Sequence, residues 1–298
     1  MPLFVFVSGF FAKSIVKNGR LRVEKVFSIV ALAMLFQLAL ISIEQHSKPL
    51  TSTLLTFRPA PWYLISLAYW YLLTPLFSQI RPAAAIELSV VAALGINCFD
   101  SVGNFLAISR TVVFLSFFLL GYYCTKENLL RVKNAKWLPA AGVMSGVILI
   151  AWIVLGDPLA NYNYISHGNT AYKESSLEGM GMRIVSYALA IIISLGVIFI
   201  TPCRKTFLAV LGERTLQIYV LHRLIRPFME HFGFFDMPVL SDPTLGILVI
   251  FVTSVAITLI CSIGIIRKPF DLILNAKWEF LRPKKAGCLA SCPIQTDN

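Results

Sequence analysis

The sequence contains few charged residues for its length. Asp, Glu, Lys and Arg make up 14% of its 298 residues, whereas hydrophobic residues make up 57% and the mean hydropathy is +0.75. An average soluble domain has about 25% charged residues. This composition therefore excludes an ordinary soluble domain and predicts a protein that crosses a membrane several times.

Acidic residues are fewer than basic residues. The sequence has 15 Asp and Glu and 26 Lys and Arg, which gives a net charge of +11. Such a charge can indicate a nucleic-acid-binding protein. Here, however, Lys and Arg are interspersed between apolar runs of about 20 residues, which is the spacing of a helical membrane bundle. We therefore interpret the charge as a topology signal and expect no nucleic-acid partner.

The sequence also lacks the motifs of common catalytic and metal sites. It has no phosphate-binding glycine loop, no G-x-S-x-G nucleophile motif and no metal-ligand spacing. Of its six cysteines, Cys98, Cys124 and Cys261 lie in or beside apolar runs, and Cys288 with Cys292 is a weak metal or lipidation signal. We expect no metal ion and no permanently bound cofactor.

Apolar runs follow one another along the chain. The first, Met1–Ala12, spans only about 18 Å as a helix against a hydrocarbon core of about 30 Å, so we interpret it as an incomplete crossing. Gly9 and Gly121 interrupt such runs and are interpreted as close-packing positions. The pattern predicts an all-α, polytopic transmembrane helical bundle with about nine crossings. The other runs are Val26–Ile43, Trp62–Ile80, Pro82–Phe99, Phe105–Cys124, Trp137–Leu155, Ile184–Ile200, Phe207–Ile225 and Leu245–Ile266.

Basic residues gather on one side of this bundle. If successive runs alternate in direction, 19 of the 26 Lys and Arg fall on the side of the first loop, which follows Met1–Ala12. By the positive-inside rule that side is cytoplasmic. We therefore predict a membrane domain over residues 1–267 and a partly disordered cytoplasmic tail over residues 268–298.

The predicted outer loops are rich in aromatic residues. Trp62 lies at the outer end of one run, and the loop from Gly156 to Gly181 carries three tyrosines and His167. Aromatic and amide side chains suit the faces and hydroxyls of sugars. The alternative is an aromatic belt at the membrane interface.

Charged and polar residues inside the apolar runs are the candidates for chemistry, because a charge in hydrocarbon costs at least a few kcal/mol. Tyr219 and His222 share one face of a predicted helix, with Arg214 about 12 Å from His222 along the axis. Arg110 interrupts another run near its outer end. We predict that Arg110, Arg214 and His222 line one polar cavity. The alternative is that both arginines reach the membrane interfaces and that His222 only packs between helices.

Four groups of residues along the chain are distinctive in their order and spacing. They are MPLF at 1–4 with SGF at 8–10, PWYL at 61–64, SRT at 109–111 with FFLLGY at 117–122, and TL at 215–216 with Tyr219 and LH at 221–222. In this combination the chain resembles the bacterial membrane acyltransferase family 3, in its fucose 4-O-acetylase-like branch. The resemblance runs from Met1 to about Arg267.

The resemblance implies an enzyme of the bacterial inner membrane. Family members transfer an acyl group, often acetyl, from cytoplasmic acyl-CoA to a hydroxyl of a cell-envelope glycan or lipid-linked saccharide. It implies an acyl-CoA site at the basic inner loop, where Arg20, Arg22 and Lys25 would hold the phosphates. The C-terminus is then expected on the cytoplasmic side.

The resemblance also implies an acceptor site towards the outer face and a membrane histidine as base. We assign Trp62 and Tyr219 as substrate contacts, and His222, Arg110 and Arg214 as catalytic residues. A base beside the reacting hydroxyl and cations near the developing charge are what acyl transfer requires.

Two departures from the family pattern bear on activity. The family places its principal histidine in a helix before the MPLF segment, where this sequence has no counterpart, and Ser116 stands where the family tends to have proline. Unless His222 substitutes, we expect the chain as written not to transfer acyl groups. The competing interpretations are a polysaccharide export or transport protein, since intramembrane charges also suit a transport path, and an inactive remnant.

The predicted topology can be tested with one engineered cysteine. In a cysteine-free background, Ser166→Cys should react with a membrane-impermeant maleimide in cells whose inner membrane is intact. Labelling that appears only after the inner membrane is permeabilised would show that the alternation is wrong.

Overall fold

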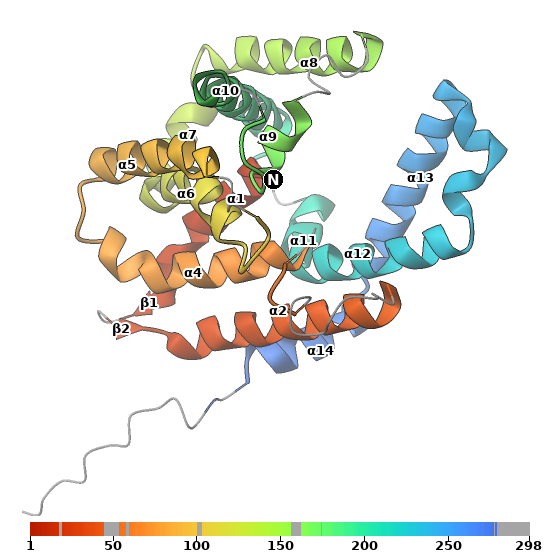
Figure 1. The fold of residues 1–298 in the computed structure, drawn as a ribbon, viewed down its shortest axis with the longest axis horizontal. Helices are drawn as coiled ribbons and strands as arrows, with labels where there is room; N and C mark the ends of the chain where they lie inside the picture. The colour runs from red at the N-terminus through yellow and green to blue at the C-terminus, as the bar shows by residue number, and fades with distance from the viewer. Residues whose placement is uncertain are drawn as a thin grey trace, which may run out of the picture.

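The computed structural model of the protein describes residues 1–17, 20–44, 54–57, 60–99, 103–155, 162–173, 175–204, 206–276 and 278. Within these residues the chain is almost entirely helical, which confirms the all-α prediction (Figure 1). The exception is a short antiparallel pair, β1 (Val16–Lys17) and β2 (Arg20–Leu21), between the first two helices.

The helices follow most of the predicted apolar runs, with shifted ends. They are α1 Pro2–Ala12, α2 Val23–Glu44, α4 Pro61–Phe77, α5 Pro82–Gly95, α6 Ile108–Tyr123, α7 Lys126–Lys133, α8 Leu138–Leu155, α9 Asn163–His167, α10 Ser176–Ile200, α11 Phe207–Glu213, α12 Thr215–His231, α13 Pro243–Cys261 and α14 Gly264–Leu274.

Local sequence signals explain where several helices begin. Proline occupies the first turn of α1, α4 and α5, where a backbone N–H would have no intrahelical partner. At α7 the Thr125 hydroxyl accepts a hydrogen bond from the Asn128 backbone N–H (3.2 Å). At α10 the Ser175 hydroxyl accepts one from the Glu178 N–H (3.3 Å). Both side chains satisfy donors that the helix leaves open.

The contact between α1 and α6 is close enough to involve backbone atoms. A Cβ atom built on Gly9 would overlap the carbonyl oxygen of Phe118, and one built on Gly121 would overlap the carbonyl oxygen of Phe6. At one end of the pair the Lys13 ammonium donates to the Cys124 carbonyl (2.6 Å). The interpretation of Gly9 and Gly121 as close-packing positions is therefore confirmed.

α4 packs against the same helix pair through buried polar contacts. The Trp70 indole N–H donates to the Thr111 carbonyl (3.1 Å), and the hydroxyls of Ser66 and Thr111 lie 2.7 Å apart. Near the other end the Tyr123 hydroxyl donates to the Phe77 carbonyl (2.7 Å). Together these bonds fix α4 parallel to α6, with the first turns of both helices at one end of the bundle.

α10 lies on the side of α6 that faces away from α4. α8 packs on α10 at one edge of the molecule (Figure 1). The Tyr187 hydroxyl donates to the Val113 carbonyl of α6. At the C-terminal end of α10, the Lys133 ammonium donates to the carbonyls of Ile198 (2.7 Å), Phe199 (2.8 Å) and Thr201 (2.6 Å). A cation at this position satisfies open carbonyls and opposes the helix dipole.

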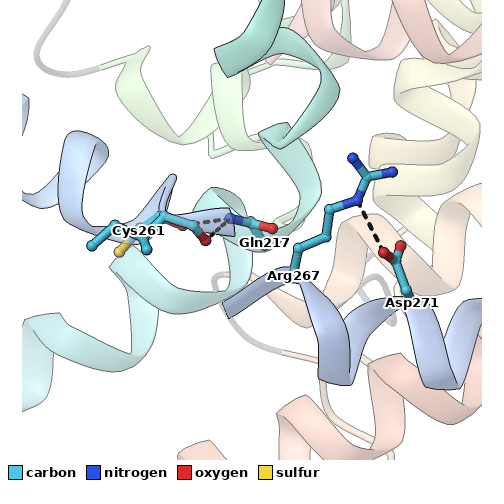
Figure 2. A network of polar contacts seen from close by, with 5 residues as sticks. Gln217, Cys261, Arg267 and Asp271 are labelled. Atoms are coloured by element: carbon cyan, nitrogen blue, oxygen red, sulfur yellow. Dashed lines mark hydrogen bonds and ion pairs between the residues drawn. The ribbon is translucent and has the colours of Figure 1, made fainter. Parts of the chain in front are cut away.

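The last helices fold back onto the first ones. α13 and α14 form a bent pair with a 61° angle, and α14 packs along α2. Figure 2 shows the Gln217 amide of α12 at the Cys261 carbonyl (2.7 Å), beside the Arg267–Asp271 ion pair of α14 (3.0 Å). This arrangement ties the start of α12 to the turn between α13 and α14.

The predicted crossings are only partly matched. Within the described residues, two helices are by length and composition able to cross a bilayer alone, Val23–Ile43 in α2 and Ser176–Ile200. The bent pairs α6–α7 (96°) and α13–α14 would bring that number to four. The count of nine stays a prediction.

The predicted crossing Phe207–Ile225 is wrong as a single helix. α11 ends at Glu213, and α12 begins at Thr215 and continues to His231 with Arg223 and Arg226 on it. The break falls at Arg214, whose side chain is turned away to the end of α13.

The predicted domain boundary at residue 267 falls inside α14. That helix continues to Leu274, and the Trp278 indole N–H then donates to the Ser28 hydroxyl of α2 (2.9 Å). The Trp278 ring also lies 4.6 Å from the ring of Phe27. This part of the predicted tail is thus packed onto the bundle, whereas residues 279–298 lie outside the described residues.

The α1–α6 crossing predicts opposite effects for two kinds of glycine substitution. Gly9→Ala or Gly121→Ala should lower the melting temperature of the purified protein, because overpacking typically costs about 1–3 kcal/mol. Gly146→Ala in α8 is the matched control, since a Cβ there meets nothing within 4 Å. It should be neutral or stabilising, because Ala favours helix by about 1 kcal/mol over Gly. Equal effects of the three substitutions would contradict the assigned crossing.

Candidate functional site

A cavity of about 620 Å³ lies among α1, α4, α6, α8, α9 and α10. This size is within the usual range of small-ligand sites. One part of its wall is polar and contains Arg110, Arg183, Ser166 and His167. The rest is mainly apolar or aromatic, apart from Ser186 and Ser194. It includes Trp62, so two of the predicted site residues, Arg110 and Trp62, meet here. The cavity is the first candidate for the site.

Arg110 is placed at the cavity by the first turn of α6. The residues before that turn, Leu106 and Ala107, have left-handed backbone conformations, with φ of 48° and 53°. Leu106 is held by a backbone hydrogen bond from its N–H to the Leu55 carbonyl (2.8 Å). Such conformations are uncommon for non-glycine residues and persist where the surrounding structure determines them. The turn therefore fixes where α6 begins and which way Arg110 points.

The Arg110 guanidinium has little compensation for its burial. Arg110 is 7% exposed, and its carbon Cζ lies 5.2 Å from the ring centre of Trp62. In the part of the chain that the structure describes, it makes no hydrogen bond and no ion pair, and its Nε is fully buried. A buried charge without acceptors is costly, so this group is poised for a partner that carries negative charge.

Arg183 is a second guanidinium on the same cavity, and the sequence analysis did not select it. It is 1% exposed, and it donates to the Ile165 carbonyl and to the side-chain oxygen of Asn97 (2.8 Å). Asn97 in turn donates to the Thr170 carbonyl (2.6 Å). These bonds join α10, the end of α5 and the segment after α9, so Arg183 both holds the cavity wall and adds positive charge to it.

His167 supplies the imidazole that lines this cavity. It lies at the end of α9, and its ring nitrogen Nδ1 is 3.5 Å from the Ser166 hydroxyl. Gly168, directly after it, is left-handed and accepts a hydrogen bond from Ser109 through its carbonyl oxygen. Sequence reasoning noticed His167 only as part of an aromatic outer loop. The signal that could have found it was a histidine beside a turn glycine in a loop with several tyrosines.

The cavity lined by Arg110 does not include the other two predicted catalytic residues, Arg214 and His222, among its described lining residues. Arg214 donates to the Ser262 carbonyl (2.6 Å) at the end of α13, and His222 is exposed on α12 with Nδ1 2.8 Å from the Ile218 carbonyl. Neither residue lines the cavity that contains Arg110. The reason is that α12 is held at its start by α13, which draws Arg214 away.

Tyr219 connects α12 to the cavity indirectly. Its hydroxyl donates to the Ala60 carbonyl just before α4 (2.5 Å), and its ring lies 5.5 Å from that of Tyr63 and 5.9 Å from that of His222. It is also near enough to Arg110 for an electrostatic interaction. Tyr219 is buried, so its observed contacts are those of a packing residue behind the Arg110 wall.

The residues predicted for acyl-CoA lie at the other end of α1. Arg20 belongs to β2, which follows α1, while Arg22 and Lys25 stand at the start of α2. Arg22 is exposed, and its backbone N–H donates to the Ile15 carbonyl (2.9 Å). The basic hairpin and the Arg110 cavity are therefore separated by the length of α1, about 16 Å for 11 residues.

Comparison with known families places the chain in one of them. The family model described as an acyltransferase domain, of acyltransferase family 3, matches residues 1–263. No curated protein and no solved structure matches the chain. Among the described residues, no three His, Cys, Asp or Glu side chains are grouped so that they could hold a metal ion.

The Arg183 network predicts a large effect of a small substitution. Asn97→Ala should lower the unfolding free energy by about 1–3 kcal/mol, because it leaves a buried guanidinium without its side-chain acceptor. Thermal unfolding of the purified protein in one detergent measures this. Asn128→Ala, on the exposed face of α7, is the matched control and should change little. If both variants unfold at the same temperature, Asn97 does not stabilise the cavity wall through Arg183.

Proposed function

This chain belongs to acyltransferase family 3, and from that premise we propose that it is a membrane O-acyltransferase of the bacterial inner membrane. It transfers an acetyl group from cytoplasmic acyl-CoA to a hydroxyl of a cell-envelope polysaccharide or of its lipid-linked precursor. The observation that carries the proposal is the cavity that combines a buried unpaired guanidinium, Arg110, with an imidazole, His167.

The acceptor is proposed to bind with its reacting hydroxyl beside His167. Trp62 lies in the same wall and offers an aromatic face of the kind on which sugar rings stack. Trp62 is itself held against Phe114, with ring centres 5.2 Å apart, and against Arg110. A rigid aromatic surface next to a charged group provides both apolar contact and orientation for a saccharide.

The chemistry then needs one proton transfer and one displacement. The acceptor oxygen attacks the thioester carbonyl carbon, forming a C–O bond as the C–S bond breaks. His167 takes the hydroxyl proton and returns it to the departing CoA thiolate, so the imidazole is regenerated. Arg110 stabilises the negative charge that develops on the carbonyl oxygen. Imidazole is the side chain that titrates nearest to neutral pH, which suits it to both proton steps.

The donor is proposed to bind at the basic hairpin. Arg20, Arg22 and Lys25 lie close together in the chain after α1, beyond the end of that helix opposite to the cavity, and their charges would attract the phosphates of CoA. Positive charge on this side agrees with a cytoplasmic position for the hairpin and for the C-terminus. Donor and acceptor would thus approach the bundle from its two faces.

The function is tested by acetylation of glycan in cells. The chain is expressed in an acceptor-bearing strain without its own acetylase, and glycan-bound acetate is measured by NMR at matched membrane levels. His167→Ala should lower the transfer rate by about 10²–10⁴-fold, the usual contribution of a general base, and Arg110→Gln should also lower it strongly. Arg131→Gln, an exposed substitution on α7, is the control and should keep full activity.

Two results would contradict this assignment. No acetate on the glycan from the unmodified chain would fit the expectation of an inactive protein and would overturn the proposed function. If His222→Ala loses transfer while His167→Ala is fully active, the chain is an acyltransferase but its general base is His222 of α12.

A further inference from the structure

We propose that the cavity binds a lipid with a phosphate head group, with the phosphate held by Arg110 under the added positive charge of Arg183 and the chain lying along α10. In the reaction proposed above, this lipid is the carrier of the acceptor saccharide. That last step rests on the proposed function, whereas binding of the lipid does not.

Arg110 has no counter-charge among the described residues. The residue is almost fully buried and its Nε has no acceptor among them; the ring of Trp62 lies against the guanidinium, and Tyr219 is near, but neither is an anion. Water cannot reach the buried Nε, and a cation–π contact compensates the charge only in part. A buried guanidinium directed into a cavity is matched best by an oxyanion, which it can bind through two parallel N–H groups.

The charged side chains that line the cavity are all positive. Arg183 adds a second buried guanidinium, whose acceptors are the neutral oxygens of Ile165 and Asn97. No Asp or Glu is among the described residues that line the cavity. The acid nearest through a direct contact is Glu178, which is exposed and accepts from the lining residue Tyr162 (2.9 Å). Two guanidinium groups on one cavity with no carboxylate among the described lining residues favour a ligand with more than one negative charge, such as a phosphate monoester or, when the lipid carries a saccharide, a diphosphate.

Away from the two arginines, the wall of the cavity is mainly apolar. Below Arg183, the lining residues Leu189, Ile193 and Val197 recur every fourth position, on one side of α10. Phe117 of α6 lines the same space. From Arg183 to Val197 the helix rises about 21 Å, which is enough for a long hydrocarbon chain beside an anionic head.

These features distinguish a lipid from a soluble ligand. A free sugar or inorganic phosphate would use the polar end and leave an apolar trough in contact with water. Acyl-CoA carries several phosphates on a large nucleotide, which fits the three basic residues Arg20, Arg22 and Lys25 better than a cavity whose remainder is mainly apolar. Only a ligand with an anionic head and an apolar chain uses both parts of the cavity.

The test measures binding in the absence of acyl transfer. The whole chain is reconstituted in nanodiscs of neutral phosphatidylcholine and titrated with farnesyl phosphate, with farnesol and with inorganic phosphate, using intrinsic tryptophan fluorescence. Trp62 and Trp152 both line the cavity and report on its occupancy. Farnesyl phosphate should bind at least ten times more tightly than either of the other two compounds.

Substitutions distinguish binding of the phosphate head group from binding of the hydrocarbon chain. Arg110→Gln should weaken farnesyl phosphate about ten- to a hundred-fold and leave farnesol unchanged, since a hydrogen bond to a charged group has that effect. Arg110→Lys should retain part of the affinity. Ile193→Phe should weaken both farnesyl compounds by filling the apolar part, while Arg131→Gln changes nothing. Arg110→Gln should also keep or raise the melting temperature of the ligand-free protein, because it removes an unpaired buried charge.

Three outcomes would overturn the inference. These are equal binding of farnesyl phosphate by the unmodified protein and Arg110→Gln, equal affinity for farnesyl phosphate and inorganic phosphate, and displacement of farnesyl phosphate by CoA at equal concentration. If binding behaves as expected but no glycan is acetylated, the lipid site stands and the proposed function fails. If the unmodified protein acetylates glycan and Arg110→Gln does so more slowly, but both bind farnesyl phosphate equally, the function stands and the inference fails.

Discussion

A guanidinium group that is buried among apolar helices loses its hydration, and three arginines of this bundle are compensated to different degrees. Arg183 has two neutral acceptors, the Ile165 carbonyl and the Asn97 side chain. Arg214 has the Ser262 carbonyl. Among the described residues Arg110 has no hydrogen-bond acceptor; it has the face of Trp62 and the nearby Tyr219. The first two therefore hold helices together, whereas the third is left for a ligand, and this difference organises the site around Arg110.

The helix packing determines where that unpaired charge lies. Gly9 and Gly121 let α1 and α6 approach until backbone carbonyls limit the contact, and Thr111 and Tyr187 then hold α4 and α10 against α6. These contacts bring the starts of α1, α4 and α6 together beside α10. Arg110 leaves the first turn of α6 at this meeting point, so its burial is a direct consequence of the close crossing.

The sequence was sufficient to predict the helical architecture and part of the site. Runs of apolar residues predicted most helices to within a few residues, because the hydropathy of a membrane segment depends on composition rather than on tertiary contacts. Arg110 and Trp62 were found because each interrupts or begins such a run. Where a run contained charged residues its meaning was less certain, and Phe207–Ile225 proved to be two helices joined at Arg214.

Arg183 and His167 could not be found in this way. The predicted run began at Ile184, so Arg183 was treated as a residue of the outer loop, although in the structure it lies within α10 and is buried. Its partner Asn97 is 86 residues away in the chain, and no local pattern connects the two. His167 lies in a loop, where position depends on contacts such as that between Ser109 and Gly168 rather than on periodicity.

The most direct test of the central claim, that the Arg110 cavity is the ligand site, is an experimental map of the protein purified with its native lipids. The account predicts phosphate density at hydrogen-bond distance, about 3 Å, from the Arg110 guanidinium, with chain density continuing along α10 past Ile193. An empty cavity at Arg110, or head-group density at His222 on the exposed face of α12, would contradict it.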